Sequence, residues 1–215
     1  MAAVPPFALM RIAQGPWPGI LLLAVVFGLQ ALTAISPGIH APFVNALGLS
    51  GHDLLGIGAY RLTTSSLVQS RAGFVGTVWV TLAIVGPLAI WRLGSLKTLA
   101  VFFFSDAAGS LAVLVPLGII AAFGSSGAQA GWSDVTVGSS SGTYALGLAV
   151  GLSLHGRARA LSIVTIITVF GVRLVFFTDR FDVEHAAALA FTGGLTLWWS
   201  RRTPSRRAQA VRNSS

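Results

Sequence analysis

The sequence predicts an all-α polytopic membrane protein, a six-transmembrane-helix bundle that forms a single domain. Three observations lead to this fold class. Hydrophobic residues make up 54% of the chain and charged residues only 9%, whereas a soluble globular chain carries about 25% charged residues. The mean hydropathy is +0.79. Apolar segments that approach the roughly 20 residues needed to cross a bilayer recur along the chain, separated by short polar gaps.

Six apolar segments are the expected transmembrane helices. They run over residues 18–35, 74–90, 98–123, 142–154, 160–177 and 184–199. The first is longer than the apolar region of a signal peptide and five more follow it, so we expect it to remain uncleaved. The segments belong to one membrane domain over residues 1–200, and residues 201–215 form a basic, disordered cytoplasmic tail.

Basic residues define the expected orientation. With the N-terminus inside, the cytoplasmic side receives most of the basic residues, including five arginines in the last fifteen residues, as the positive-inside rule requires. We therefore expect a multi-pass protein of the cell membrane with both termini in the cytoplasm. The formal net charge of +8 then faces anionic lipid headgroups. The expected partners are membrane lipids and transmembrane proteins, and no nucleic acid, because no nucleic-acid-binding motif accompanies the charge.

Two ionisable residues lie inside predicted helices. Asp106 and Arg173 are costly there, so both are candidate functional residues, and a small transporter or lipid-handling protein is the function that would depend on them. The chain contains no cysteine, which excludes disulfides, cysteine-based metal sites and a thiol nucleophile. We expect neither a cofactor nor a metal.

A string of glycines and serines, residues 138–142, precedes the fourth predicted helix. That helix rises only about 20 Å, so its outer end is expected below the membrane surface. Backbone N–H groups at a helix N-terminus have no intrahelical partner, and the helix dipole favours negative charge there. A nucleophilic serine needs such donors for its oxyanion. The alternative is a structural loop that ends in an N-cap serine.

A nucleophilic serine also needs a base. Of the four histidines, only His185 is expected at the outer end of a membrane helix, on the same side as the serines. Small residues follow His185 and also line the fourth helix, which allows two membrane helices to approach closely. We therefore predict a catalytic dyad of Ser140 and His185, with Ser141 as the alternative nucleophile. The expected oxyanion donors are the backbone N–H groups of Ser139, Ser140, Ser141 and Gly142.

These features resemble the rhomboid family of intramembrane serine proteases. That family has six core helices, a large first loop lying in the membrane, a short fourth helix started by Gly-x-Ser-Gly, and a histidine on the sixth helix. Here Gly138-x-Ser140 and Glu184-His185 stand at the two catalytic positions. Residues 60–66 (YRLTTSS) are similar to the family's Trp-Arg-x-x-Thr-Ser segment before the second helix. The resemblance covers residues 18–200 and implies a Ser–His protease without a metal or cofactor.

The sequence departs from the family on the second helix and in the serine motif. Phe74 and Val78 stand at the family's His-x-x-x-Asn positions, and neither donates a side-chain hydrogen bond. Ile90 stands where the family has a glutamate, and Ser141 replaces the glycine after the nucleophile. The loss of one oxyanion donor lowers the rate by about 10²–10³.

Two functions therefore stay open. The first is a divergent intramembrane serine protease in which Ser140 attacks a peptide carbonyl and His185 acts as base and then as acid. The second is a catalytically inactive relative that binds transmembrane helices or lipids. The pattern also resembles divergent rhomboid-like proteins of actinobacteria, for which proteolysis does not follow from the fold.

Overall fold

The computed structural model describes residues 15–69, 76–176 and 179–202. Within these ranges the regular elements are all helical, and the only β-type pairing is an isolated bridge between Leu49 and Thr136. The predicted all-α class is confirmed. The N-terminal fourteen residues and residues 203–215 of the predicted basic tail lie outside the described ranges, whereas Arg201 and Arg202, which the prediction placed in the tail, form the last residues of α10.

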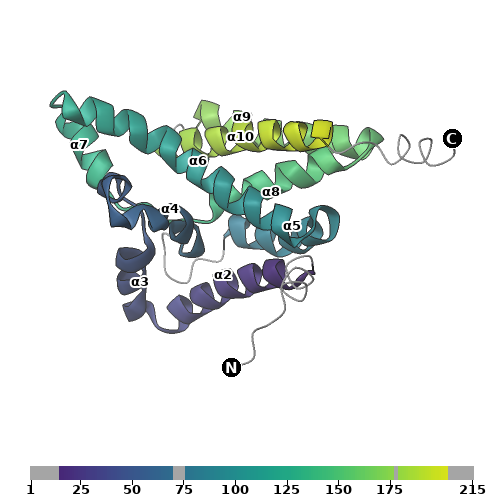
Figure 1. The fold of residues 1–215 in the computed structure, drawn as a ribbon, viewed down its shortest axis with the longest axis horizontal. Coiled ribbons are helices and arrows are strands. Elements are labelled where there is room, and N and C mark those ends of the chain that lie inside the picture. Colours follow the sequence, from purple (N-terminus) through teal and green to yellow (C-terminus); the bar gives the residue numbers. More distant parts are fainter. Residues whose placement is uncertain (1–14, 70–75, 177–178, 203–215) are drawn as a thin grey trace.

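Six long helices form the body of the molecule (Figure 1). They are α2 (Trp17–Ile35), α5 (Thr77–Leu93), α6 (Ser95–Ala122), α8 (Ser140–Ser153), α9 (Gly156–Phe176) and α10 (Arg180–Arg202). Short elements connect them: η1 (Pro37–Ile39), α3 (His40–Leu47), η2 (Gly51–Leu55), η3 (Ile57–Tyr60), α4 (Arg61–Thr64), η4 (Ser65–Leu67) and α7 (Ser126–Ser133).

Each long helix overlaps one predicted segment, but two starts differ in a way that matters. The fourth helix begins at Ser140 instead of residue 142, which places the candidate serines in its first turn. The sixth begins at Arg180 instead of Glu184, because Asp179 and Asp182 form a reciprocal cap at its start: the N–H of Asp182 lies 3.0 Å from Asp179 Oδ1. The predicted start of the second helix, Phe74, lies outside the described residues.

Two of the described helices are long and apolar enough to cross a membrane. These are α2 and α6, whose most apolar stretches have mean hydropathies of 2.1 and 1.9. Residues Val78–Leu93 of α5 form a shorter apolar helix. The expectation that six helices span the bilayer, with both termini inside, stays a prediction.

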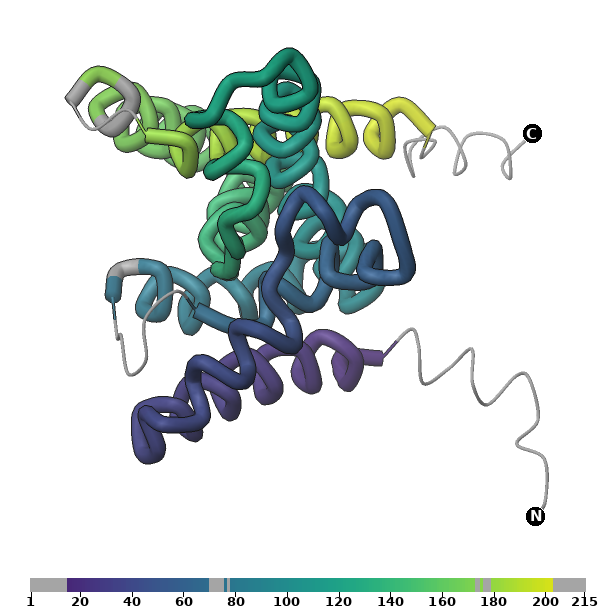
Figure 2. Tube along the Cα trace, turned by 90° about the vertical axis from the view of Figure 1, so that its left-hand side faces the viewer, coloured from purple at the N-terminus to yellow at the C-terminus, as the bar shows by residue number. Residues whose placement is uncertain are grey.

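α6 and α8 occupy the middle of the molecule. α2 lies on one side of them and α9 and α10 lie on the other, as both views show (Figures 1 and 2). The main core lies where α2, α5, α6 and α8 meet, and its largest buried side chain is Phe102. A Cβ at Gly142 would lie 2.8 Å from the Phe102 ring, so this glycine allows the first turn of α8 to rest directly on α6.

α10 packs closely on α6 by two devices. A Cβ at Gly109 would lie 2.6 Å from the backbone oxygen of Glu184, so the two helices touch almost backbone to backbone. About one turn away on α6, the hydroxyl of Ser105 lies 2.7 Å from the hydroxyl of Thr192 on α10. Small residues and hydroxyl pairs of this kind hold helices together in a bilayer. The packing fixes the start of α10 beside the start of α8.

Candidate active site

The structure brings Ser140 and His185 together. The Nε2 atom of His185 lies 2.7 Å from the Oγ atom of Ser140, which is within the range of a nucleophile–base hydrogen bond. Ser140 is the first residue of α8, and His185 lies in the second turn of α10. The two helices are in direct contact. The residues are 45 positions apart in the chain, so only the tertiary fold makes this pair.

Two aromatic rings enclose His185, which is 4% exposed. Tyr144 meets it edge to face, with ring centroids 5.2 Å apart, and Phe170 does so at 5.6 Å. Contacts of this geometry stabilise aromatic pairs and orient the imidazole. Tyr144 is four residues after Ser140, so it lies on the same face of α8. The sequence analysis missed both rings, although the spacing of Tyr144 was a usable signal.

Ser141 contacts Glu184 and not His185. Its Oγ donates to Oε1 of Glu184 at 3.2 Å, and Ser110 of α6 donates to the same atom at 3.4 Å. Consecutive residues of α10, Glu184 and His185, thus hold consecutive serines of α8. The geometry places Ser140 on the histidine and Ser141, the alternative nucleophile, on the carboxylate.

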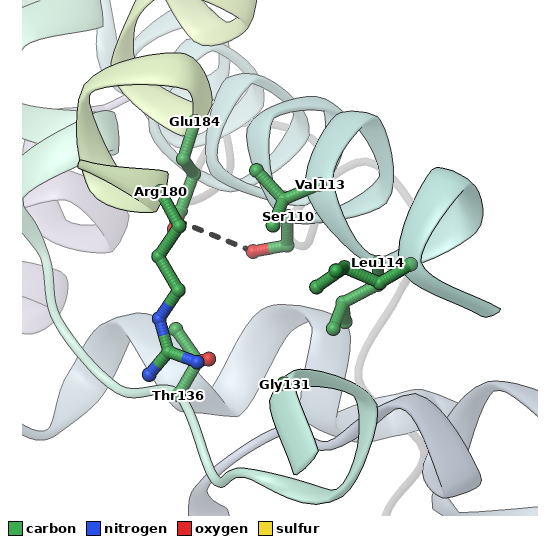
Figure 3. A pocket seen from close by; sticks show the side chains of 8 residues that line it. Ser110, Val113, Leu114, Gly131, Thr136, Arg180 and Glu184 are labelled. Carbon is green, nitrogen blue, oxygen red and sulfur yellow. Dashed lines mark hydrogen bonds between the residues drawn. The ribbon is translucent and has the colours of Figure 1, made fainter. Parts of the chain in front are cut away.

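A small cavity adjoins this second pair (Figure 3). Glu184 and Arg180 of α10 face Ser110 of α6 across it, and Thr136 and Gly131 line the side below. Its volume is about 10 Å³, which is room for about one water molecule. The cavity therefore places Arg180, Thr136 and Ser110, together with apolar side chains of α6, around the Glu184 carboxyl.

Asp106 of α6 lies between the first turn of α8 and the neighbouring carboxyl of Glu184. It is 1% exposed, and its carboxyl faces the backbone N–H of Gly142. The Oδ1 atom has no hydrogen-bond partner within the described chain. Acidic groups are favoured at helix N-termini, so Asp106 is placed to stabilise the start of α8. Whether it meets Arg173 falls outside the described side chains.

The expected oxyanion donors separate into two groups. The N–H groups of Ser140, Ser141 and Gly142 are the first three of α8 and have no acceptor within the helix. Ser139 precedes them, and its Oγ accepts a hydrogen bond from Nε2 of Gln69 at 2.5 Å. Gln69 was not singled out from the sequence, because it lies seventy residues away in the first loop.

Two of the positions at which the sequence departs from the rhomboid pattern, Val78 and Ile90, lie on α5. Ile90 packs between α5 and α2, where a Cβ at Gly19 would lie 2.6 Å from its Cγ1 atom. Val78 is half-buried in the first turn of α5. Neither side chain offers a polar atom to the site. Among the described residues, no three His, Asp or Glu side chains gather closely enough to hold a metal ion.

A wide apolar groove of about 680 Å³ lies beside the pair, between α5, α8 and α9. Val85 and Leu88 line one wall, and Ile166 and Val169 line the other. Tyr144 and Phe170, which pack on His185, also line this groove. The two rings that pack on His185 thus form part of the wall of this groove.

No family model matches the chain, and no curated protein or solved structure matches it either. The resemblance to rhomboid proteins therefore stays a prediction from the sequence.

Proposed function

We propose that this protein is a rhomboid-like integral membrane protein that cleaves transmembrane substrates with a Ser140–His185 dyad. The observation that carries the proposal is the 2.7 Å contact between Ser140 Oγ and His185 Nε2. The serine lies at a helix N-terminus and the histidine is buried, so nucleophile, base and backbone donors converge. That combination is what acyl transfer by a serine requires.

In the proposed reaction, Ser140 Oγ forms a bond to the carbonyl carbon of a substrate peptide, and its proton passes to His185 Nε2. The carbonyl oxygen becomes an oxyanion, which the first N–H groups of α8 stabilise. The imidazolium then gives the proton to the departing amine as the C–N bond breaks. A water molecule, deprotonated by His185, releases the acyl group and restores the Ser140 hydroxyl.

Exposed apolar side chains on five long helices support the placement of the whole bundle in a bilayer. A soluble protein rarely exposes so many large apolar side chains around its circumference. They include Leu21 on α2, Ile84 on α5, Ile119 on α6, Leu161 on α9 and Leu197 on α10, each at least half exposed. In this proposal all six long helices enter the membrane.

Aromatic and basic side chains support the proposed orientation. Arg92 stacks on Trp91 at the end of α5, and Arg202 stacks on Trp198 at the end of α10, at 4.8 and 4.3 Å from the ring centroids. Lys97, at the start of α6, lies 5.6 Å from the Trp199 ring. Tryptophans and basic residues gathered at the same helix ends are typical of a cytoplasmic interface.

The groove between α5, α8 and α9 supports the proposed substrate class. Its lining is mainly apolar and it reaches the rings that enclose His185. A transmembrane segment that unwinds near its outer end would lie in this groove with its apolar side chains covered. The peptide carbonyl would then approach Ser140 from the groove side.

The test is covalent labelling of the detergent-purified protein with a fluorophosphonate probe. Wild type is expected to label, and Ser140→Ala and His185→Ala are expected to lose labelling. Ser141→Ala is the matched control, because the same atom is removed one residue away, and it is expected to retain labelling. A folded wild-type protein that does not react would rule out the protease.

A second function is favoured by one specific observation. Asp106 faces the N–H of Gly142, one of the expected oxyanion donors, and a carboxylate there would compete with a developing negative charge. This arrangement supports a catalytically inactive protein that binds transmembrane helices or lipids in the same groove. It predicts that a photoactivatable lipid or helix crosslinks to groove residues while the fluorophosphonate does not react.

A further inference from the structure

The start of α8 lacks the cap that its sequence offers. Serine is a favoured N-cap residue because its Oγ accepts the N–H of the second or third helical residue. Ser139 holds this position, and its carbonyl accepts the first helical bond, from the Thr143 N–H at 2.9 Å. Its side chain makes no cap hydrogen bond among the described residues. Its φ of −85° and ψ of 6° also differ from the extended backbone of N-caps.

Gln69 accounts for the position of the Ser139 side chain. Its Nε2 atom donates to Ser139 Oγ at 2.5 Å, and both residues are buried, at 7% and 0% exposure. A buried amide that lost this acceptor would leave a donor unpaired, so the contact is costly to break. The hydroxyl of Ser139 therefore points toward the first loop instead of toward the helix.

The first loop holds Gln69 in place. His40 of α3 places its Nε2 atom 2.8 Å from the backbone oxygen of Gln69. A carbonyl only accepts, so this nitrogen carries the proton. The turn before α8 is tied to the same loop, because the N–H of Gly138 donates to the backbone oxygen of Ser65 at 3.1 Å. The first loop therefore holds both the side chain of Ser139 and the backbone just before it by hydrogen bonds.

We infer that Gln69 is a positioning residue, which keeps Ser139 from capping α8 and so leaves the first N–H groups of the helix available to the oxyanion. The inference rests on the proposed function. The Gly142 N–H already faces the Asp106 carboxyl, so a capping hydroxyl would occupy the N–H of Ser141, and the developing oxyanion needs donors from the same turn. Gln69 acts only through Ser139 and does not touch the substrate.

The first test uses three variants and the rate of fluorophosphonate labelling. Gln69→Met keeps the volume but removes the donor, which frees Ser139 to cap, and labelling is expected to slow about fivefold. Adding Ser139→Ala removes the competing cap, so the double variant is expected to label faster than Gln69→Met alone. Ser139→Ala by itself is also expected to label faster than Gln69→Met.

A merely structural contact predicts equal labelling rates in the three variants. If the Gln69–Ser139 hydrogen bond only held the loop, Ser139→Ala would slow labelling as much as Gln69→Met, and the double variant would not recover. That result would overturn the inference while leaving the dyad intact, provided that wild type still labels.

The second readout does not depend on catalysis. Hydrogen–deuterium exchange of peptides covering the first turn of α8 is expected to slow in Gln69→Met, because Ser139 then binds an amide hydrogen. The exchange is expected to return to the faster rate in the double variant. Unchanged exchange in Gln69→Met would overturn the inference. An unreactive wild type with the expected exchange pattern would instead remove the protease function and retain the control of Ser139 by Gln69.

Discussion

The starts of α8 and α10 lie side by side, yet they are built in opposite ways. α10 begins with a closed cap, in which Asp179 Oδ1 accepts from the N–H of Asp182 and Asp182 Oδ2 accepts from the N–H of Asp179, at 3.0 and 3.2 Å. α8 begins with Ser139, whose hydroxyl is turned away to Gln69. A closed start satisfies its own donors and stabilises the helix. At the start of α8 the Asp106 carboxyl faces the N–H of Gly142, and the N–H groups of Ser140 and Ser141 remain for another group.

The division matches what each helix contributes. α10 must hold His185 steady, and a capped first turn limits fraying just before that residue. α8 contributes Ser140 and, in the proposed reaction, the donors that face the oxyanion. In the proposed reaction, the stabilised helix start therefore carries the base and the less stabilised one carries the nucleophile, which is a common compromise at functional sites.

The largest expected effect comes from Gly142→Ala, which tests the close approach of α8 to α6. The added Cβ would lie 2.9 Å from the backbone oxygen of Phe102, an atom that cannot turn away. We expect a loss of about 2 kcal/mol in the free energy of unfolding, together with slower labelling, because the turn that carries Ser140 must shift. Thermal unfolding in detergent measures the first effect.

The matched control for that change is Gly193→Ala in α10. No atom lies within 4 Å of the position of its Cβ, and alanine favours a helix interior over glycine by up to about 1 kcal/mol. This variant is expected to be neutral or slightly stabilised. Equal losses in both variants would show that the first turn of α8 is not tightly packed on α6.

Glu184→Ala is expected to have the next largest effect. It removes the acceptor of two buried hydroxyls, Ser110 and Ser141, and each lost partner leaves a buried donor unpaired. A loss of about 1 kcal/mol in stability is expected, because removal of a buried carboxyl that lies next to Asp106 offsets part of the cost of the two unpaired hydroxyls. Glu184→Gln keeps an oxygen acceptor of the same shape and should lose less. Equal losses in the two variants would mean that the hydroxyl contacts contribute little.

The sequence predicted the helical fold class and a contact between His185 and one of two neighbouring serines, Ser140 or Ser141, because apolar segments and small-residue faces are local patterns. The positions of Ser140 and His185 relative to their helices were enough to place both near the same side. The sequence could not predict which serine meets the histidine. That choice depends on the rotation of α8 about its axis, which is fixed only when α8 packs against α6 and α10.

Gln69 shows why the rest of the site was not predictable. It lies in the first loop, which carries no helical period, and its role appears only when the loop folds against residues 138–139. The start of α10 was also missed, because Arg180 and Asp182 are polar and the search for apolar segments stopped at Glu184. The helix nevertheless starts at Arg180, because the cap of Asp179 and Asp182 provides acceptors for the N–H groups of both residues.

Asp179→Ala tests the closed start directly. Loss of an N-cap carboxylate costs about 1 kcal/mol, and the effect should appear as a lower Tm with faster exchange in the first turn of α10. Asp179→Ser retains a capping oxygen and is the control, expected to lie close to wild type. If both variants matched wild type, the closed start of α10 would not be the source of its stability.

The smallest expected effect concerns a third helix start, that of η2, where Ser50 and Asp53 form a capping box beside Arg61. Burial raises the pKa of the Asp53 carboxyl, but hydrogen bonds from Ser50 and the charge of Arg61 outweigh it. The pKa therefore lies below its ordinary value of 3.8. A lowered carboxyl pKa contributes stability above the unfolded value, and this contribution disappears as the pH falls through the folded value.

Asp53→Asn should therefore be less stable than wild type at about pH 7 and should approach it at about pH 3. The difference at the higher pH is expected to stay below about 1 kcal/mol, because surface charge pairs are screened by solvent and salt. Thermal unfolding across this pH range, with and without added salt, measures it. A difference that grew on acidification would show that Asp53 is destabilising when charged, and the closed cap of η2 would then differ in kind from that of α10.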